Sequence, residues 1–348
     1  MISLTWLIFV LVGGVSLSFL LFAYLLTIPS LKRFFSLKIR PRDIHEGDKP
    51  RIGGIVIIPL FLLGVWILTG FDMVSSSHAL GITFGSIAVL VYGLIDEKYD
   101  LAWYTQLCIQ VGIALIIILF DIGLNQLMMP WGEYLALDRF EIVFIGETWV
   151  VFRDLITLVW IVGLMNVVNW LDGVDGLAGG TGVIAFGILY ALSLMPEVGQ
   201  DHIALLSILL ASLYTGFLIH NWYPSKVFLG TSGSMFLGFS LAVLSIMSGG
   251  KIATSALVFA FPIIDACIVI WQRLRARQSI FQGDNRHFHY MLLNSGFSPI
   301  QTTSMLLSVS FFFGIMALFL DTQGKIFTFI GGSIVLILLR PQSRKNNQ

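Results

Sequence analysis

The stretch LTWLIFVLVGGVSLSFLLFAYLL at residues 4–26 contains no charged side chain. A helix of roughly 17–25 apolar residues crosses a bilayer core about 30 Å thick, so this stretch predicts a transmembrane helix. No basic residue precedes it, and Lys32 and Arg33 follow shortly after it. This arrangement favours a retained first helix whose N-terminus lies outside.

Ten more stretches meet this criterion in a chain of 348 residues that is 57% hydrophobic and 11% charged. The charged fraction is less than half of the ~25% usual in soluble domains, so there are too few polar residues to cover a water-facing surface. The eleven expected spans are 4–26, 52–70, 79–95, 103–120, 154–171, 177–194, 202–219, 234–249, 252–272, 300–320 and 326–339. Short gaps within two pairs, 154–171/177–194 and 234–249/252–272, leave a broken or re-entrant helix open. We predict one all-α integral membrane domain over 1–348, with ten or eleven transmembrane helices.

Lysine and arginine divide unevenly between the two sides of this arrangement. Sixteen of them lie in the set of loops 27–51, 96–102, 172–176, 220–233 and 273–299 with the tail from 340, and 4 lie on the opposite side. Cytoplasmic loops carry the excess of basic residues, so the first set is predicted to face the cytoplasm. The opposite side contains the alternating run 140–151 with Gly146 and Glu147 at its turn, which predicts a small outer β-hairpin.

Composition also excludes several functions. The formal net charge is zero, so no strongly basic domain exists to bind nucleic acid. Cys108 and Cys267 both lie in apolar stretches and indicate neither a disulfide framework nor a zinc site. No Walker loop or G-x-G-x-x-G fingerprint is present, so phosphate groups would have to be held by side chains and metal.

Acids and amides gather in the loops assigned to the cytoplasm. Asp96, Glu97 and Asp100 could be a helix end in interfacial water, but clustered carboxylates also suit a hard cation or a general base. In NVVNWLDGVDGLAGG at 166–180 four polar residues recur every three positions and trace nearly one stripe of a helix: Asn166, Asn169, Asp172 and Asp175. They could be ordinary cap and turn residues. Polar groups at that depth are costly without partners, which favours a site.

The loop RQSIFQGDNRHFHYMLL at 277–293 contains an H-x-H pair, His287 and His289, beside Asp284 and Arg286. Without a third soft ligand the pair is weak support for zinc. Imidazoles with an arginine can instead bind phosphate oxygens or stabilise a leaving group. The alternative is a solvated basic loop that serves only membrane orientation.

These residues together resemble the polyprenyl-phosphate N-acetylhexosamine-1-phosphate transferase family, of glycosyltransferase family 4. The resemblance runs from about His45 to Gly296 and rests on six motifs: KPRIGGIVI at 49–57, DEKYDL at 96–101, NVVNWLDGVDGLAGG at 166–180, VFLGTSGSMFLGF at 227–239, PIIDA at 262–266 and DNRHFHYMLL at 284–293. The resemblance implies a many-helix fold with a cytoplasmic active-site cleft in a bacterial cytoplasmic membrane. It also implies transfer of N-acetylhexosamine 1-phosphate, GlcNAc 1-phosphate above all, from a UDP-sugar to undecaprenyl phosphate. This reaction releases UMP, requires Mg²⁺ or alternatively Mn²⁺, and starts a cell-surface polysaccharide.

The resemblance also implies roles for individual residues. Asp96 corresponds to the acid that deprotonates or positions the lipid phosphate, with Glu97 as its partner, and His287 and His289 correspond to the histidine motif near the diphosphate. Asp175 and position 231 correspond to the metal region. The candidate substrate-binding residues are Arg51, Asn166, Asn169, Asp172, Asn221, Lys226 and Arg286. The expected partners are the UDP-sugar, the polyprenyl phosphate and membrane lipid, with a homodimer left open.

Three positions depart from the family pattern. Thr231 stands where relatives carry an acid that resembles the principal Mg²⁺ ligand, Glu97 replaces an Asp, and Tyr290 replaces a final histidine. A hydroxyl is a much poorer Mg²⁺ ligand than a carboxylate. A non-catalytic member that binds lipid carrier or nucleotide is therefore the main alternative. A secondary transporter is disfavoured, because Asp265 is the only ionisable residue well inside an expected span and no internal repeat is present.

Overall fold

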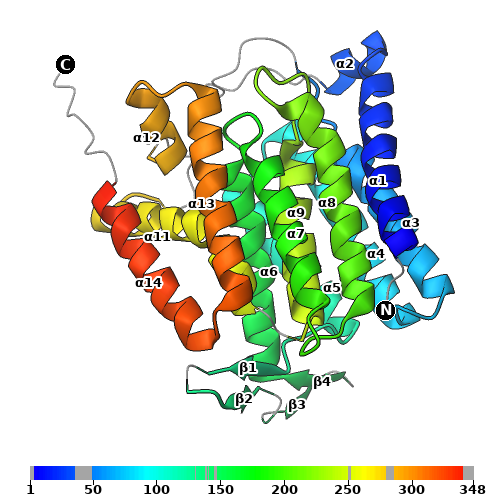
Figure 1. Cartoon of the computed structure of the whole chain (residues 1–348), viewed down its shortest axis with the longest axis vertical. Coiled ribbons are helices and arrows are strands. Elements are labelled where there is room, and N and C mark those ends of the chain that lie inside the picture. The colour runs from blue at the N-terminus through cyan, green and yellow to red at the C-terminus, as the bar shows by residue number, and fades with distance from the viewer. Residues whose placement is uncertain are drawn as a thin grey trace.

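Helices occupy every stretch in which the sequence predicts a span (Figure 1). The computed structural model describes residues 4–35, 49–129, 131–137, 139, 141–144, 147–249, 252–279 and 286–339. The helices at the expected spans are α1 (Leu4–Leu25), α3 (Gly53–Gly70), α4 (Ser76–Tyr99), α5 (Trp103–Leu119), α6 (Val151–Leu171), α7 (Leu177–Ser193), α8 (Asp201–Asn221), α9 (Gly230–Met247), α10 (Ile252–Val258) with α11 (Ala260–Arg275), α13 (Pro299–Phe319) and α14 (Thr322–Leu339). Two short helices, α2 (Pro29–Phe35) and α12 (Phe288–Asn294), lie in the connecting loops. The all-α membrane class is confirmed.

The expected span 252–272 is broken into two helices. Within the described residues, seven helices are long and apolar enough to cross a bilayer, and the pair α10 and α11, bent by 78°, makes an eighth if it forms one span. The helices α5, α7 and α14 are apolar but shorter. Figure 1 shows α11 lying across the direction of α13. The chain is a multi-pass membrane protein, and the number of its passes stays a prediction.

Two small antiparallel sheets interrupt the helices between α5 and α6. Strands β3 (Glu141–Phe144) and β4 (Glu147–Val150) pair with Glu141 opposite Val150, which confirms a hairpin within 140–151. Gly146 at its expected turn lies outside the described residues. The second sheet, β1 (Gln126–Met128) with β2 (Tyr134–Ala136), was not predicted. Its strands of three residues are too short to give a periodicity signal.

Helix α9 is the centre of the bundle, because each of its residues from Gly230 to Ile246 is buried. Small residues let its neighbours approach closely, as in other packed membrane helices. A Cβ atom at Gly93 of α4 would collide with the backbone of Ser232, and one at Gly238 would collide with the backbone of Leu164 in α6. Helices α4 and α6 are thereby held directly against α9. The polar residues at their ends are brought within reach of the first turn of α9.

A smaller core joins the C-terminal helices, where residues such as Phe261, Phe288 and Phe313 pack together. Around both cores the surface of the bundle is rich in exposed apolar side chains, among them Phe9, Phe319 and Phe327, which are 69%, 82% and 71% exposed. An apolar surface on this scale is expected where lipid replaces water as the solvent.

Several of the loops assigned to one side by their charge gather, in the parts that the structure describes, at one end of the molecule. Figure 1 shows α2, α12 and the connections from α6 to α7 and from α8 to α9 at the end opposite the four strands. The side of the membrane that this end faces stays a prediction from the charge bias.

The orientation can be tested by cysteine labelling in intact cells. In a background without Cys108 and Cys267, both of which are exposed, we expect a cysteine at Asn294 to resist an impermeant thiol reagent. A cysteine at Thr322 should react, because it lies beyond the outer end of α13 in this orientation. Labelling after permeabilisation serves as the control for reactivity. The reverse pattern would place the polar end of the bundle outside the cell.

Candidate active site

Asp96 lies in the last turn of α4 and is only 4% exposed. Its Oδ1 accepts hydrogen bonds from the backbone N of Leu101 at 3.2 Å and from Nε2 of Gln106 at 2.8 Å. Its Oδ2 accepts a hydrogen bond from the hydroxyl of Thr231 at 3.1 Å. Thr231, which stands where the family resemblance predicts an acid, therefore contacts the candidate general base directly.

Glu97 is also buried and faces the beginning of α9. The backbone N–H of Ser232 donates to its Oε1 at 3.4 Å. Gly230 has a φ of +75° and lies so close that a Cβ atom there would collide with Oε1 of Glu97. The positive φ favours glycine at position 230, and the absence of a side chain there lets Glu97 lie against the first turn of α9.

The stripe expected on one helix is interrupted, because α6 ends at Leu171. Asp172 and Asp175 lie in the turn that follows, so the prediction that all four polar residues share a helix face is wrong. The turn is closed by Gly176, which has a φ of +77° and donates its backbone N–H to Oδ1 of Asn221 at 3.0 Å. Gly176 in the left-handed conformation precedes α7, and its bond to Asn221 holds the turn 172–175 against the end of α8.

Asp175 is 2% exposed and is held by Ser225. Its Oδ2 accepts from the backbone N of Ser225 at 3.0 Å, and its Oδ1 accepts from the hydroxyl of the same residue at 2.9 Å. The hydroxyl of Thr303 in α13 donates to the backbone carbonyl of Asp175 at 2.9 Å. The carboxylate is fixed in one orientation.

Asp172 shows that the acids share one electrostatic environment. Burial raises the pKa of Asp172 to about 8; the positive charge of Arg51 opposes this rise, and the negative charges of Asp175 and Glu97 add to it. These acids come from α4 and from the turn after α6, which are far apart in the sequence. The site combines an excess of carboxylates with one arginine.

The two asparagines of α6 differ in their surroundings. Asn166 forms an amide pair with Gln110 of α5, donating to its Oε1 at 2.6 Å. Asn169, nearly one turn closer to the acids, accepts a hydrogen bond from the hydroxyl of Ser234 at 2.9 Å. Asn169 therefore joins the first turn of α9, whereas Asn166 links α6 to α5 inside the bundle.

The segment before α3 brings positive charge to the same place. Arg51 forms an isolated parallel bridge with Phe228, which fixes its backbone beside the segment that leads into α9. Nζ of Lys49 lies 3.2 Å from the hydroxyl of Ser225, the residue that holds Asp175. Lys226 is exposed, and its backbone N–H donates to the carbonyl of His220. Lys49, which had no predicted role, contacts the residue that holds Asp175, whereas the side chain of Lys226 is exposed.

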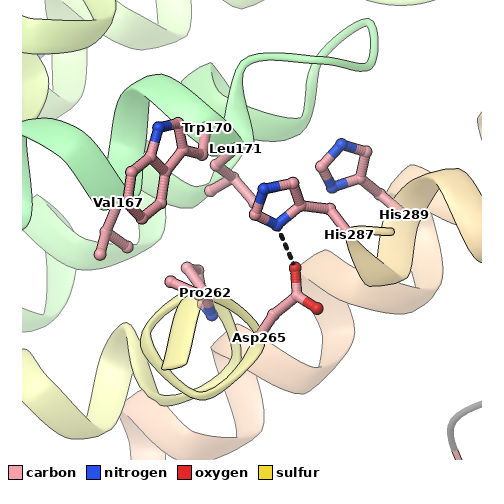
Figure 2. Close-up of a pocket in the computed structure, with 8 residues that line it drawn as sticks. Val167, Trp170, Leu171, Pro262, Asp265, His287 and His289 are labelled. Atoms are coloured by element: carbon pink, nitrogen blue, oxygen red, sulfur yellow. Dashed lines mark hydrogen bonds and ion pairs between the residues drawn. The ribbon is translucent and has the colours of Figure 1, made fainter. Parts of the chain in front are cut away.

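His287 and His289 lie beside the C-terminal end of α6 (Figure 2). Nδ1 of His287 is 2.8 Å from Oδ2 of Asp265 in α11, and the rings of the two histidines are nearly parallel with centroids 5.7 Å apart. His289 is 1% exposed, and neither ring nitrogen has a hydrogen-bond partner among the described residues. Burial and then the neighbouring His287 lower the pKa of His289 to about 3, so this ring is neutral.

The histidine loop reaches the acids through Gly173. A Cβ atom at Gly173 would collide with Nε2 of His289 and with the hydroxyl of Tyr290, so the turn after α6 passes directly over these side chains. Arg286 donates from Nη2 to Oε1 of Gln278 at 2.7 Å. Asp284 lies outside the described residues. The loop thus borders the turn that contains Asp172 and Asp175.

The acids of the site supply only some of the ligands that a divalent cation needs. No group of three or more His, Cys, Asp or Glu is placed to hold a metal ion among the residues that the structure describes. Mg²⁺ usually takes one or two carboxylates, water and substrate phosphates rather than a cage of protein ligands. The mutual repulsion of Asp172, Asp175 and Glu97 favours a cation between them. These residues could supply part of the coordination of a Mg²⁺ ion, and the remaining ligands would have to come from water and a bound diphosphate.

Comparison with known proteins agrees with this arrangement. The model for glycosyl transferase family 4 matches residues 79–249. A probable undecaprenyl-phosphate N-acetylglucosaminyl 1-phosphate transferase of Bacillus subtilis is 30% identical over 287 residues, which cover 81% of this chain and 76% of the relative. The decaprenyl-phosphate N-acetylglucosaminephosphotransferase of Mycobacterium tuberculosis strain H37Rv is 30% identical over 74% of this chain and 69% of the relative. A phospho-N-acetylmuramoyl-pentapeptide-transferase of Staphylococcus carnosus is 28% identical over 85% of this chain and 94% of the relative.

The matched range contains the acid pair of α4, the turn after α6 and the first turn of α9. The chain belongs to glycosyl transferase family 4, among the polyprenyl-phosphate N-acetylhexosamine-1-phosphate transferases.

Proposed function

We propose that this protein transfers GlcNAc 1-phosphate from UDP-GlcNAc to undecaprenyl phosphate. An oxygen of the lipid phosphate attacks the β-phosphorus and forms a new P–O bond. The bond from this phosphorus to the bridging oxygen breaks, and the oxygen leaves with UMP. The product is undecaprenyl-diphosphate-GlcNAc, the first membrane-bound intermediate of a cell-surface polysaccharide.

The observation that carries this proposal is the meeting of four acids at one end of a membrane bundle. Asp96 and Glu97 lie in the last turn of α4 and contact the first turn of α9. Asp172 and Asp175 follow α6, and Asp175 is bound by Ser225 in the segment that leads into α9. Phosphoryl transfer depends mainly on positioning and on offsetting the charge of the phosphates. A site with carboxylates for a cation, a nearby arginine and two histidines supplies both.

We infer separate roles for the two acid pairs. Asp96, with Glu97 beside it, accepts a proton or a hydrogen bond from the lipid phosphate, because its carboxylate is held ready by Gln106 and by Thr231. Asp175 and Asp172 lie on the nucleotide side, where Arg51 offsets the charge of Asp172. Asn221 orients the turn after α6 by accepting the N–H of Gly176. Asn169 orients the beginning of α9 by accepting the hydroxyl of Ser234. Lys49 replaces Lys226 as our candidate for contact with a phosphate.

Mg²⁺, or Mn²⁺ in its place, would be held by Asp175 and by the diphosphate, with Asp172 and Glu97 close by. When bound, the ion offsets the negative charge that develops on the phosphate oxygens. The side chains of this site then fix where the ion and the two substrates sit. We place the site on the cytoplasmic face of a bacterial cytoplasmic membrane, where nucleotide sugars are available.

One observation favours a second function. Thr231 donates its hydroxyl to Asp96, so a neutral group bonded to the candidate base stands where the family resemblance predicts an acid. A member with this change can retain the lipid or the nucleotide without transferring anything. This non-catalytic reading predicts binding of UDP-GlcNAc with no lipid product.

The experiment is a transfer assay with the purified protein, undecaprenyl phosphate and a panel of UDP-hexosamines labelled in the sugar. We expect a labelled lipid with UDP-GlcNAc, no product with EDTA, and recovery with Mg²⁺ or Mn²⁺. Binding of UDP-GlcNAc is measured in the same preparation. Binding without product under every metal would favour the non-catalytic function, and neither binding nor product would contradict both.

A further inference from the structure

Asp265 is a buried carboxylate with two partners in the histidine loop. It lies in α11 and is 6% exposed. Its Oδ2 is 2.8 Å from Nδ1 of His287, and its Oδ1 accepts the backbone N–H of Phe288 at 3.0 Å. Figure 2 shows the carboxylate below the His287 ring, on the side away from Trp170. One side chain thus binds both the ring and the first backbone N–H of α12.

Anchoring the backbone of the histidine loop explains only one of the two hydrogen bonds of Asp265, the one to Phe288. Phe288 begins α12, and its N–H needs one acceptor, which a neutral Asn or Ser would also supply. An ionised side chain among apolar neighbours is costly unless its charge is used. Its surroundings include Pro262 and Ala266, which are apolar. The second oxygen and the charge therefore serve the imidazole of His287.

The contact selects one form of the ring. An ionised carboxylate can only accept hydrogen bonds, so Nδ1 of His287 carries a proton in this pair. Nε2 then lies on the opposite side of the ring from Asp265, toward the C-terminal end of α6 (Figure 2). Trp170 borders the ring with centroids 6.1 Å apart, and His289 lies parallel to it. The ring has little freedom to turn.

We propose that Asp265 is a positioning residue for transfer, which fixes Nδ1–H of His287 toward itself and presents Nε2 to a phosphate oxygen of the nucleotide sugar. This inference rests on the proposed function. With a proton on both nitrogens, Nε2–H donates to the phosphate and the carboxylate stabilises the resulting positive ring. The group that benefits is the bridging oxygen that leaves with UMP, because negative charge develops there as the P–O bond breaks.

The kinetic test compares Asp265→Asn with His287→Gln and the double variant. Asparagine still offers an oxygen to Phe288, so the backbone anchor is retained, but its amide can also donate to Nδ1 and select the other tautomer. Loss of a residue that orients a functional side chain typically costs about 10–100-fold. We expect kcat to fall by that factor with KM for UDP-GlcNAc changed less than about threefold. The double variant should be no slower than His287→Gln alone.

The matched control is Asp154→Asn. Asp154 is equally buried, at 6% exposure, and also accepts a backbone N–H, but it lies in the first turn of α6 at the other end of the bundle. Asp154→Asn is expected to leave kcat unchanged. A purely structural role for Asp265 predicts instead that both variants lose activity only in proportion to unfolded protein.

A spectroscopic test does not depend on activity. With ring-¹⁵N-labelled histidine, and with the His287 signals assigned by their loss in His287→Gln, the wild type should show protonated Nδ1 at His287. Asp265→Asn should shift this signal toward the other tautomer. Should Asp265→Asn not fold, Asp265→Glu replaces it, and it should retain protonated Nδ1 because its carboxylate is kept.

An unchanged His287 signal in Asp265→Asn, or an additional loss of kcat in the double variant, would overturn the inference. A changed signal in a protein that makes no lipid product would support the contact and contradict the proposed function instead. The two failures are therefore distinguishable.

Discussion

Asp96→Asn is expected to lower the rate of GlcNAc 1-phosphate transfer by roughly 10²–10⁴-fold, the range lost when a positioned acid or base is removed. The fold should persist. Asparagine can still accept from Leu101 and Gln106 through its oxygen, and its amide can donate to the hydroxyl of Thr231, which then acts as an acceptor. The measurement is the initial rate with saturating UDP-GlcNAc and undecaprenyl phosphate, together with the midpoint of thermal unfolding.

Asp154→Asn again controls for the neutralisation of a buried carboxylate far from the site. It should keep a rate close to that of the wild type. A similar loss in both variants, or an Asp96→Asn rate near that of the wild type, would remove Asp96 from the reaction. In the second case Glu97 becomes the candidate base.

Thr231→Asp is expected to lower the Mg²⁺ concentration needed for half-maximal transfer and to raise kcat. The hydroxyl of Thr231 is 3.1 Å from Oδ2 of Asp96, so a carboxylate at 231 would face another carboxylate at close range. Two like charges at such a distance repel unless a cation lies between them. The variant should therefore unfold at a lower temperature in EDTA and recover when Mg²⁺ is added, by a larger margin than the wild type.

The matched control is Thr231→Asn, which has nearly the shape of aspartate without its charge. It should show neither the loss of stability in EDTA nor the lower Mg²⁺ requirement. If Thr231→Asp and Thr231→Asn behave alike, position 231 is not at the metal. If only Thr231→Asp makes product, the wild type is a non-catalytic member of the family.

Much of the fold could be predicted from hydropathy, because each span must satisfy its backbone within an apolar helix. The bend between α10 and α11 could not be located in this way. The apolar composition continues from Ile252 through Val258 and into α11. Pro262 was the unused signal, because it has no N–H to bond to the carbonyl of Val258, where α10 ends. The sheet of β1 and β2 was missed because its strands are too short for a pattern.

The site could be predicted only as a set of motifs. Asp96, Glu97 and Asp175 were found because acids beside apolar spans are rare, but a repeat of three residues does not reveal that α6 ends at Leu171. The sequence marked Asp265 as an ionisable residue inside a span and as part of the motif PIIDA, but gave it no partner. Its partner His287 is 22 residues away, and only the folded arrangement of α11 and α12 brings the two together.

The most direct measurement of the proposed function uses UDP-GlcNAc labelled in both the β-phosphate and the sugar. The purified wild-type protein, supplied with undecaprenyl phosphate and Mg²⁺, should move both labels together into the lipid and release one unlabelled UMP for each lipid product. Movement of the sugar label alone, with the labelled phosphate left in UDP, would contradict transfer of a sugar phosphate. So would the absence of any lipid product from folded protein that binds UDP-GlcNAc.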